Sequence, residues 1–254
     1  MNSSPQLPHH RIAIATVVGP GRLGRPLARG LHAAGFRVIG PLGRGESVAP
    51  ADVVLLCVPD AEIARVAATV PPGIGLIGHM SGATPLAASG ADFGLHPLQS
   101  FTGDEGHEAF RGIGCAVAGR SPEALAAARE LVERLGGRPF EVADSHRPGY
   151  HAAASVASNF VVTLLAAAEQ LASTAGLTPA DARMLLAPLV RTTVANWAEL
   201  GPEAALTGPI ARGDASTVDR QRQAIVEDTP ELLVLFDALV ASTRALAVKG
   251  RVAA

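Results

Sequence analysis

The chain has 254 residues, of which 48% are hydrophobic, and a formal net charge of -2. This length and apolar content are enough for one large domain or two smaller ones. The near-neutral charge, with no basic run, excludes nucleic acid as an expected partner. Cys57 and Cys115 lie in apolar runs, which indicates buried small side chains rather than a disulfide framework. No spacing of residues typical of a metal site occurs.

The start of the chain and its most apolar stretch bear on localisation. Residues 1–11 are polar and lack the apolar core of a signal peptide. The stretch 152–168 is the most apolar long one, but it includes Ser155, Asn159 and Thr163. It therefore predicts a buried helix rather than a membrane span. We expect a soluble, cytoplasmic protein with no membrane partner.

The first motif with a chemical meaning is Gly19-Pro20-Gly21-Arg22-Leu23-Gly24, a G-x-G-x-x-G sequence. It follows the β-branched run 12–18 and precedes a helical pattern that stops at Gly35. A second strand-like run at 36–39 completes the order of a βαβ dinucleotide-binding unit. The three glycines would permit a tight turn, approach of the backbone to a pyrophosphate, and close packing of helix on strand. The alternative is a glycine turn with no ligand.

The residues after the second strand favour NADP(H) over NAD(H). An NAD site usually has Asp or Glu at the end of this strand, where it holds the ribose 2′-hydroxyl. Here the strand is predicted to end at Ile39-Gly40, and the first acid is the later Glu46. Arg44 is the available partner, and a guanidinium suits a 2′-phosphate. The many arginines and single acid of the first fifty residues agree. The alternative for Arg44 is a solvated loop charge.

Strand and helix patterns alternate as far as residue 142, and helical patterns alone follow. Further strands are predicted at 52–58, 75–79, 93–96, 114–118 and 139–142. Helices are predicted at 61–70 behind an Asp60 cap, at 122–135 behind a Ser121 cap, at about 148–175, at 179–201 behind a Thr178 cap, and twice more after a loop at 207–214.

This pattern predicts an α/β fold, in which a doubly wound Rossmann-type sheet is followed by an all-helical C-terminal domain. We place the NADP-binding domain at residues 1–146 and the helical domain at residues 147–254. Ligands bind at the carboxyl ends of the strands in such a sheet. Val58, Pro59 and Ser81 should line the cofactor there. His96 should enter the same crevice, either to donate to a substrate carbonyl or carboxylate or to fix its own turn, while His79 is assigned a structural role.

Two features of the helical half carry possible substrate chemistry. His151, Ser155 and Asn159 recur every four residues, so on one helix they form a polar stripe that rotates by only about 40° per step. The stripe faces either the substrate or another helix. In the first case His151 would supply a proton and Asn159 would orient the substrate. In the loop 207–214, Arg212 would clamp a substrate carboxylate, unless it pairs with Asp214, which fits as the N-cap of the next helix.

The chain resembles a known family through five motifs, which are Gly19 to Gly24, Cys57-Val58-Pro59-Asp60, Leu95-His96-Pro97-Leu98-Gln99, Tyr150-His151-Ala152-Ala153-Ala154-Ser155 through Asn159-Phe160, and Leu206 to Asp214. They are similar to those of bacterial proteins that join a Rossmann-like domain to a helical C-terminal domain of unassigned function. The resemblance covers nearly the whole chain after the first ten residues. The wider group is similar to pyrroline-5-carboxylate reductase, ketopantoate reductase and the β-hydroxyacid dehydrogenases.

The resemblance implies NADP(H)-dependent reduction of a small carbonyl or imine acid between the domains, and a homodimer built through the helical domain. Two relatives, ketopantoate reductases and β-hydroxyacid dehydrogenases, typically carry a catalytic lysine in that domain. The only lysine here, Lys249, is near the C-terminus. The serine-threonine-glycine substrate loop of pyrroline-5-carboxylate reductases is not reproduced at 207–214. We therefore predict an NADP-dependent oxidoreductase, with a non-catalytic NADP(H)-binding or sensing protein of the same fold as the alternative.

Overall fold

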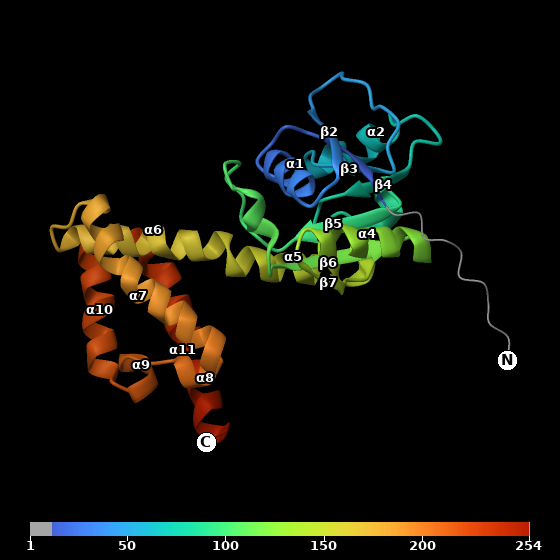
Figure 1. Ribbon diagram of the computed structural model, residues 1–254. Coiled ribbons are helices and arrows are strands. Elements are labelled where there is room, and N and C mark those ends of the chain that lie inside the picture. The colour runs from blue at the N-terminus through green and yellow to red at the C-terminus, as the bar shows by residue number, and fades with distance from the viewer. Residues whose placement is uncertain (1–11, 254) are drawn as a thin grey trace, which may run out of the picture. The chain divides into compact units, whose positions relative to one another are not determined.

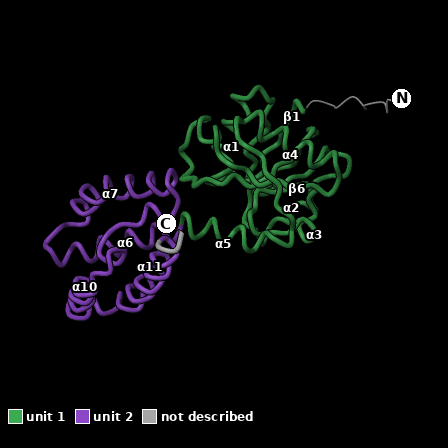
Figure 2. Tube along the Cα trace, turned by 90° about the horizontal axis from the view of Figure 1, so that it is seen from below, with its two compact units in different colours: residues 1–158 green, residues 159–254 purple. Residues whose placement is uncertain are grey.

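The chain forms two compact units, residues 1–158 and 159–254 (Figure 2). The computed structural model describes residues 12–253, with side chains for residues 12–250, so the predictions for residues 1–11 lie outside the described residues. The first unit contains a sheet with its helices, and the second is helical (Figure 1). The first unit includes α5 (Arg147–Ala157). The domain boundary after residue 146 stays a prediction.

A seven-stranded sheet is the frame of the first unit, in the order β2-β1-β3-β4-β5-β6-β7. Neighbouring strands pair in parallel, except β5 and β6, which are antiparallel. The strands are β1 (Ile14–Val18), β2 (Arg37–Leu42), β3 (Val53–Leu56), β4 (Leu76–His79), β5 (Phe93–Pro97), β6 (Gly114–Gly119) and β7 (Arg138–Glu141). The strand order reverses beside β1, which is where such sheets bind ligands. The predicted α/β fold with a Rossmann-type sheet is confirmed.

Both faces of the sheet are buried, and β3 shows why. All four of its residues are buried, but they alternate between two apolar cores. Val53 and Leu55 pack in the core that contains α1 (Gly24–Ala33) and α4 (Pro122–Arg134). Val54 and Leu56 pack against α2 (Ile63–Ala67) on the opposite face. Since successive side chains of a strand point to opposite faces, helices must cover both sides.

The structure corrects several predicted elements of the first unit. The strand predicted to end at Ile39-Gly40 continues to Leu42. The helix predicted at 61–70 is a 3-10 turn, η1 (Asp60–Glu62), followed by the short α2. The carboxylate of Asp60 does not cap this helix but accepts a hydrogen bond from the Ser81 hydroxyl, at 2.8 Å. The Ser121 cap is confirmed, because its hydroxyl accepts a hydrogen bond from the backbone N–H of Ala124. Three short elements were not predicted, η2 (His107–Phe110), η3 (Asp144–His146) and α3 (Leu86–Ser89).

The second unit is all-helical, as predicted. Its helices are α6 (Asn159–Thr174), α7 (Pro179–Leu200), α8 (Pro202–Ala205), α9 (Pro209–Arg212), α10 (Ala215–Asp228) and α11 (Leu233–Ala253), with the turn η4 (Pro230–Leu232). The side chains of Thr178 and Asp214 cap α7 and α10, as expected. The single long helix predicted at about 148–175 is wrong, because Ser158, with φ -123° and ψ -76°, separates α5 from α6. The predicted 207–214 loop also contains the short helix α9.

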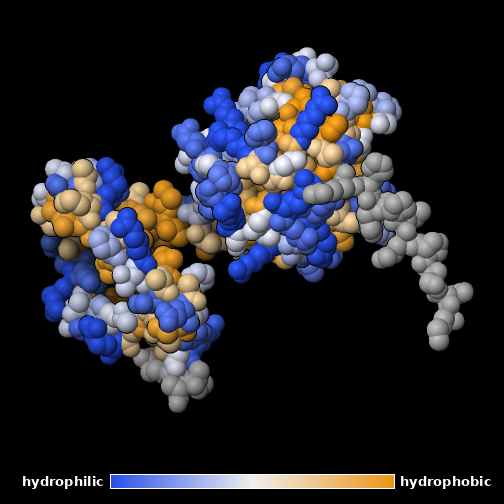
Figure 3. Space-filling view, viewed as in Figure 1, coloured by the Kyte–Doolittle hydropathy of each residue, from blue (hydrophilic) through white to orange (hydrophobic). Residues whose placement is uncertain are grey.

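Little of the second unit is buried. Among its described side chains, the buried apolar ones are Ala182, Val218, Ile225, Val240 and Ala247. Larger apolar side chains are exposed on α6 and α7, and hydrophobic surface gathers beside α6 (Figure 3). The stretch Asp144–Thr174 is long and apolar enough to cross a membrane by length and composition alone, and none of its most apolar window is buried. The prediction of a buried helix here is therefore wrong for the single chain.

Two large polar side chains lie inside the first unit. The exposed fraction is 0% for His79 and 1% for Arg147. Both lie against Gly94 of β5, where an added Cβ would be 2.7 Å from Nη2 of Arg147 and 3.3 Å from Nε2 of His79. Burial, followed by the nearby Arg147 charge, lowers the pKa of His79 to about 4. Its Nδ1 accepts a hydrogen bond from the N–H of Ser81, so the proton of the neutral ring is on Nε2.

We expect the buried His79 to make the stability of the protein depend on pH. Its folded pKa of about 4 is below its ordinary value of 6.5, so the unfolded chain binds more protons between these values. The free energy of unfolding should therefore be highest above pH 6.5 and fall as the pH drops toward 4, by ~3 kcal/mol for this group. Urea unfolding followed by circular dichroism, repeated across this pH range, measures how the free energy of unfolding changes with pH. His79→Gln should reduce this pH dependence but not abolish it, because the pKa of His96 is also lowered to about 4, whereas His107→Gln, at an exposed histidine, should leave it unchanged. If the free energy of unfolding changed with pH equally in His79→Gln and in the wild type, His79 would not be a source of the pH dependence.

Candidate functional site

The loop between β1 and α1 is a cradle that requires glycine at its two ends. Gly19 has a φ of +108°, and an added Cβ would be 2.3 Å from the carbonyl oxygen of Cys57. At Gly24 an added Cβ would be 1.9 Å from the carbonyl oxygen of Gly19. Beside Gly21, by contrast, nothing lies within 4 Å of the Cβ position. The loop is therefore tightly packed at both ends and open in the middle.

This geometry fits a dinucleotide. The space beside Gly21 leaves room for a pyrophosphate against the backbone, and the N-terminal N–H groups of α1 favour negative charge. The first turn of α1 has no acidic residue that would oppose it. Val58 follows β3 and packs close to Gly19, with Pro59 next to it. Pro20, Arg22 and Leu23 form the rest of the loop before α1. These residues could hold the cofactor phosphates.

Arg44 lies in the turn that follows β2, where the ribose of a dinucleotide would be. The carboxylate of Glu46 accepts a hydrogen bond from the backbone N–H of Gly43 in the same turn. Arg44 is exposed and forms no ion pair or hydrogen bond within residues 12–250. Arg29 has another role, because its guanidinium donates to the carbonyl oxygen of Gly103, at 2.8 Å. The arginine-rich start of the chain is thus partly structural, and Arg44, like Arg22, Arg25 and Arg37, is exposed without a partner among the described residues.

Three aromatic side chains meet at the end of β5. His96 is on this strand, and Tyr150 and His151 are on α5. Nδ1 of His96 and the hydroxyl of Tyr150 are 2.6 Å apart, and the ring centroids of His96 and His151 are 6.1 Å apart. A Cβ at Gly82 would lie 2.9 Å from each histidine ring, so a bare backbone there lets the rings approach. The structure therefore brings together His96 and His151, both predicted site residues.

The surroundings of His96 fix its charge. Burial, and then the charges of His151 and Arg147, lower the pKa of His96 to about 4, so its ring is neutral at pH 7. Burial raises the pKa of Tyr150 to about 12, which keeps its hydroxyl protonated. Nε2 of His96 makes no hydrogen bond within the described part of the chain, yet it is not among the fully buried unpaired atoms. It is therefore unpaired and not fully buried.

Arg147 and Asp144 fix α5 to the sheet. The guanidinium of Arg147 donates to Asp144 at 3.0 Å and to the carbonyl oxygen of Ser81 at 3.2 Å. Asp144 also accepts from the backbone N–H groups of Leu86 and Ala87 in α3. Because Tyr150 and His151 are one turn after Arg147, these contacts determine where both side chains lie.

Ser81 is buried at the end of β4, and its hydroxyl is engaged within the turn. It donates to Asp60 and accepts from the backbone N–H groups of Ala83 and Thr84. These bonds organise the turn that carries Gly82. Contact of Ser81 with the cofactor stays a prediction.

Two predicted residues, Asn159 and Arg212, belong to the helical unit. Asn159 is the first residue of α6, so the predicted stripe with His151 does not follow one continuous helix. Arg212 is the last residue of α9. Asp214 accepts hydrogen bonds from the N–H and hydroxyl of Thr217, at 3.0 and 2.7 Å, which confirms it as the N-cap of α10. No ion pair between Arg212 and Asp214 occurs in the described structure.

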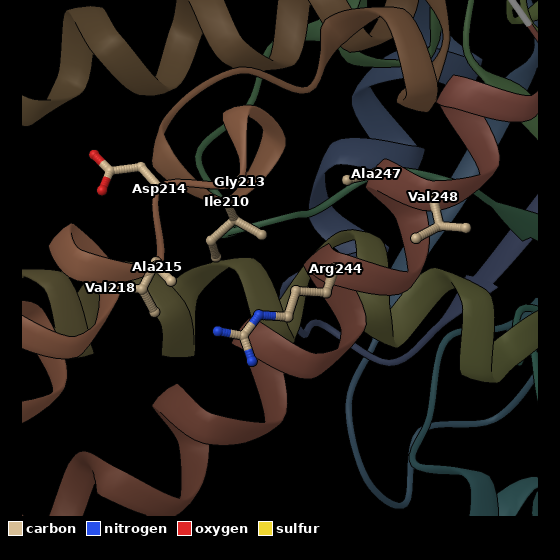
Figure 4. A pocket seen from close by; sticks show the side chains of 8 residues that line it. All are labelled: Ile210, Gly213, Asp214, Ala215, Val218, Arg244, Ala247 and Val248. Atoms are coloured by element: carbon tan, nitrogen blue, oxygen red, sulfur yellow. The ribbon is translucent and has the colours of Figure 1, made fainter.

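A pocket of about 280 Å³ lies between the start of α10 and the helix α11. Its wall is mostly apolar, with Ile210, Val218 and Ala247, and the guanidinium of Arg244 lies beside it, whereas the carboxylate of Asp214 points away (Figure 4). Arg212 is not one of the residues that line it. Sequence reasoning did not single out Arg244, because a lone arginine in an apolar helix has no motif around it.

Sequence reasoning also missed the roles of Arg147 and Tyr150. Tyr150 is the only tyrosine of the chain and precedes His151 directly. Arg147 is three residues before Tyr150 and four before His151, the spacing of side chains that share one face of a helix. That spacing could have indicated that the three side chains lie together. The burial of Arg147 could not have been predicted from the sequence, because arginine is seldom buried.

Comparisons with known proteins agree with this fold. A protein from Thermotoga maritima, TM1727, is 24% identical, with a TM-score of 0.76 over 94% of this chain and 100% of that one. A candidate NADP oxidoreductase from Bacteroides fragilis, BF3122, is 22% identical, with a TM-score of 0.76 over 93% and 99%. The pyrroline carboxylate reductase of Plasmodium falciparum, with NADP bound, is 12% identical, with a TM-score of 0.58 over 93% and 98%. At these identities the likeness shows the fold alone.

The sequence comparisons are more specific. No curated protein matches this sequence. A family model, described as a domain of unknown function, DUF2520, matches residues 113–243, which is more than half of the chain. The match runs from the second part of the sheet through most of the helical unit, and the complete fold is a Rossmann-like unit with a helical C-terminal region, as the sequence resemblance implied. The chain therefore belongs to the DUF2520 family.

Proposed function

We propose that this protein is an NADP(H)-dependent oxidoreductase that reduces a small carboxylate-bearing ketone or imine. The observation that carries the proposal is that two sites share one edge of one sheet. The glycine cradle follows β1, and the cluster of His96, Tyr150 and His151 surrounds the end of β5. A cofactor cradle and groups able to move a proton are the two parts that a reductase needs. A similar fold holds NADP in the Plasmodium falciparum enzyme.

Each part of the site has a defined task in this proposal. Bound NADPH supplies a hydride to the carbonyl or imine carbon. The loop from Gly19 to Gly24 holds the pyrophosphate, and Arg44 binds the 2′-phosphate. His96 is neutral at pH 7, so it donates a hydrogen bond from Nε2 rather than a proton. His151 is half-buried with no hydrogen bond to any described residue, and it supplies the proton. Asn159 and Arg212 hold the substrate from the helical unit.

We also propose a homodimer built through the helical unit. Phe160, Met184, Leu189 and Trp197 are all more than half exposed. On α7, Leu185, Leu189 and Leu200 lie within roughly 60° of arc at about 100° per residue, so they form one apolar face. A unit with five buried apolar side chains among its described residues needs further burial to be stable, and a second copy provides it without a new partner.

Arg44→Glu should discriminate between the two cofactors. The change removes the cation that would bind the 2′-phosphate and adds a repelling charge, so NADPH affinity should fall by about tenfold or more while NADH affinity is roughly kept. Fluorescence titration with each nucleotide measures the dissociation constants for NADPH and NADH. Arg65→Glu, at an exposed arginine of α2, is the control. Equal loss of NADPH and NADH affinity would rule out the 2′-phosphate role.

His151→Phe should abolish turnover with cofactor binding intact, because it keeps a ring of similar size but cannot supply a proton. We expect kcat to fall by about 100-fold or more. NADPH oxidation with a panel of 2-oxo acids and cyclic imines is the assay, and His32→Phe, on the exposed face of α1, is the control. Unchanged rates in His151→Phe would remove it from the mechanism. NADPH binding by the wild type without turnover on any substrate would favour the non-catalytic binding protein.

The dimer has a direct test. Light scattering with size exclusion, without detergent, should give twice the chain mass of 25.9 kDa. Leu185→Glu places a charge on the apolar face of α7 and should shift the protein toward monomer, whereas Gln221→Glu on α10 should not. A monomeric wild type, or one that is recovered only with detergent, would contradict the proposal, and the latter would point to a membrane.

A further inference from the structure

The hydrogen bond between Tyr150 and His96 has a direction. A phenol O–H is a stronger donor than the N–H of a neutral imidazole, and an imidazole nitrogen is a stronger acceptor than a phenol oxygen. The bond to Nδ1 is the one hydrogen bond of the Tyr150 hydroxyl in the described structure. Tyr150 therefore donates to Nδ1, and the remaining ring proton of His96 is on Nε2. His96 presents an N–H donor at the ring nitrogen that has no partner among the described residues.

The charges around His96 are mainly positive. Arg147 and His151, both on α5, disfavour a positive charge at the ring. Asp60, after β3, acts in the opposite direction. It is exposed and bonded to Ser81, so solvent screens much of its effect. Tyr150 is protonated and contributes no charge. Burial is the largest cause and acts in the same direction as the positive charges, because a dry site disfavours any cation that is brought into it.

We infer that the substrate of this site is a ketone rather than an imine, and that Tyr150 sets the selectivity by holding His96 in the Nε2–H form. This inference rests on the proposed oxidoreductase function and narrows its substrate class. Reduction of a ketone develops negative charge on the carbonyl oxygen. The N–H donor at Nε2 of His96 stabilises that charge as it forms.

The electron balance of ketone reduction agrees with the groups present. The carbonyl carbon gains a hydride, with two electrons, from NADPH, and the π electrons of the C=O bond move to the oxygen. The oxygen accepts a hydrogen bond from Nε2 of His96 while its charge develops and then takes a proton from His151. The product is a hydroxy acid, and the nucleotide would be left as NADP⁺.

An imine is disfavoured by the same features. Hydride adds to the protonated form, which brings a cation into the site and needs an acceptor for its N–H. His96 offers a donor there, and the buried surroundings of its ring disfavour an added cation. An N–H donor that faces another N–H leaves both unpaired, which is costly in a site shielded from water.

Tyr150→Phe is the matched variant, because it removes one hydroxyl and keeps the ring against His96 and Phe140, whose centroids are 5.6 and 5.9 Å away. Substrates are 2-oxobutyrate and 2-oxo-3-methylbutyrate as ketones, and 1-pyrroline-2-carboxylate and 1-pyrroline-5-carboxylate as imines. We expect wild-type kcat/KM to be higher for a ketone by about tenfold or more, and Tyr150→Phe to lower the ketone rate by about tenfold. His96→Gln, which keeps an N–H donor, should retain more ketone activity than His96→Leu.

Nitrogen-15 NMR of the histidine side chains tests the tautomer without turnover. The His96 signals, assigned by their loss in His96→Gln, should show a protonated Nε2 and an unprotonated Nδ1. In Tyr150→Phe the chemical shifts of the two His96 nitrogens should move toward the values of a mixture of both tautomers. A protonated Nδ1 in the wild type would overturn the inference.

The outcomes separate this inference from the function on which it rests. Ketone turnover with slow imine turnover and an Nε2–H tautomer supports both. Imine turnover equal to or faster than ketone turnover overturns the ketone assignment and leaves the oxidoreductase in place. Absence of NADPH binding, or of turnover on all four substrates, overturns the proposed function and the inference together.

Discussion

The arrangement of the first unit depends on one buried guanidinium. Arg147 enters the interior from the start of α5, where its charge is costly to remove from water. The cost is offset by Asp144, by the carbonyl oxygen of Ser81, and by the missing side chain of Gly94, which leaves space for the group. Each of these partners comes from a different segment. One side chain therefore joins α5 to the turn after β4 and to Gly94 of β5.

The chemistry of the cluster follows from that anchor. With α5 held in place, Tyr150 and His151 both face His96, and Gly82 provides the space between the rings. The Arg147 charge then acts on the groups that it positions, because it opposes protonation of both His79 and His96. A neutral His96 with a defined tautomer is the result. Burial is the main cause of the neutral charge state and Arg147 adds to it, so Arg147 is a positioning residue with an additional electrostatic effect on the site.

The two ends of the site differed in how far they could be predicted from sequence. The glycine loop was predictable, because close backbone approach excludes every side chain at Gly19 and Gly24 and so leaves a pattern in the sequence. The strands were predictable because a sheet buried on both faces needs continuous apolar runs. The Tyr150–His96 pair joins residues that are 54 positions apart, and no local pattern encodes such a contact. The break at Ser158 was missed because the residues on both sides of it favour a helix, and helical propensity does not reveal a single residue with non-helical backbone dihedrals.

The burial of the apolar faces of α6 and α7 was predicted wrongly for a related reason. Apolar periodicity shows that a face is covered but does not show what covers it. Within one chain these faces are exposed to solvent, so most of their apolar area gives no stabilisation by burial. The proposed substrate residues Asn159 and Arg212 belong to this unit. A scaffold holds side chains in place for catalysis only when its own packing is complete. Closure of these faces by a second copy would therefore serve the substrate side of the site as well as stability, whereas the cofactor cradle and the His96 cluster are packed within the first unit of a single chain.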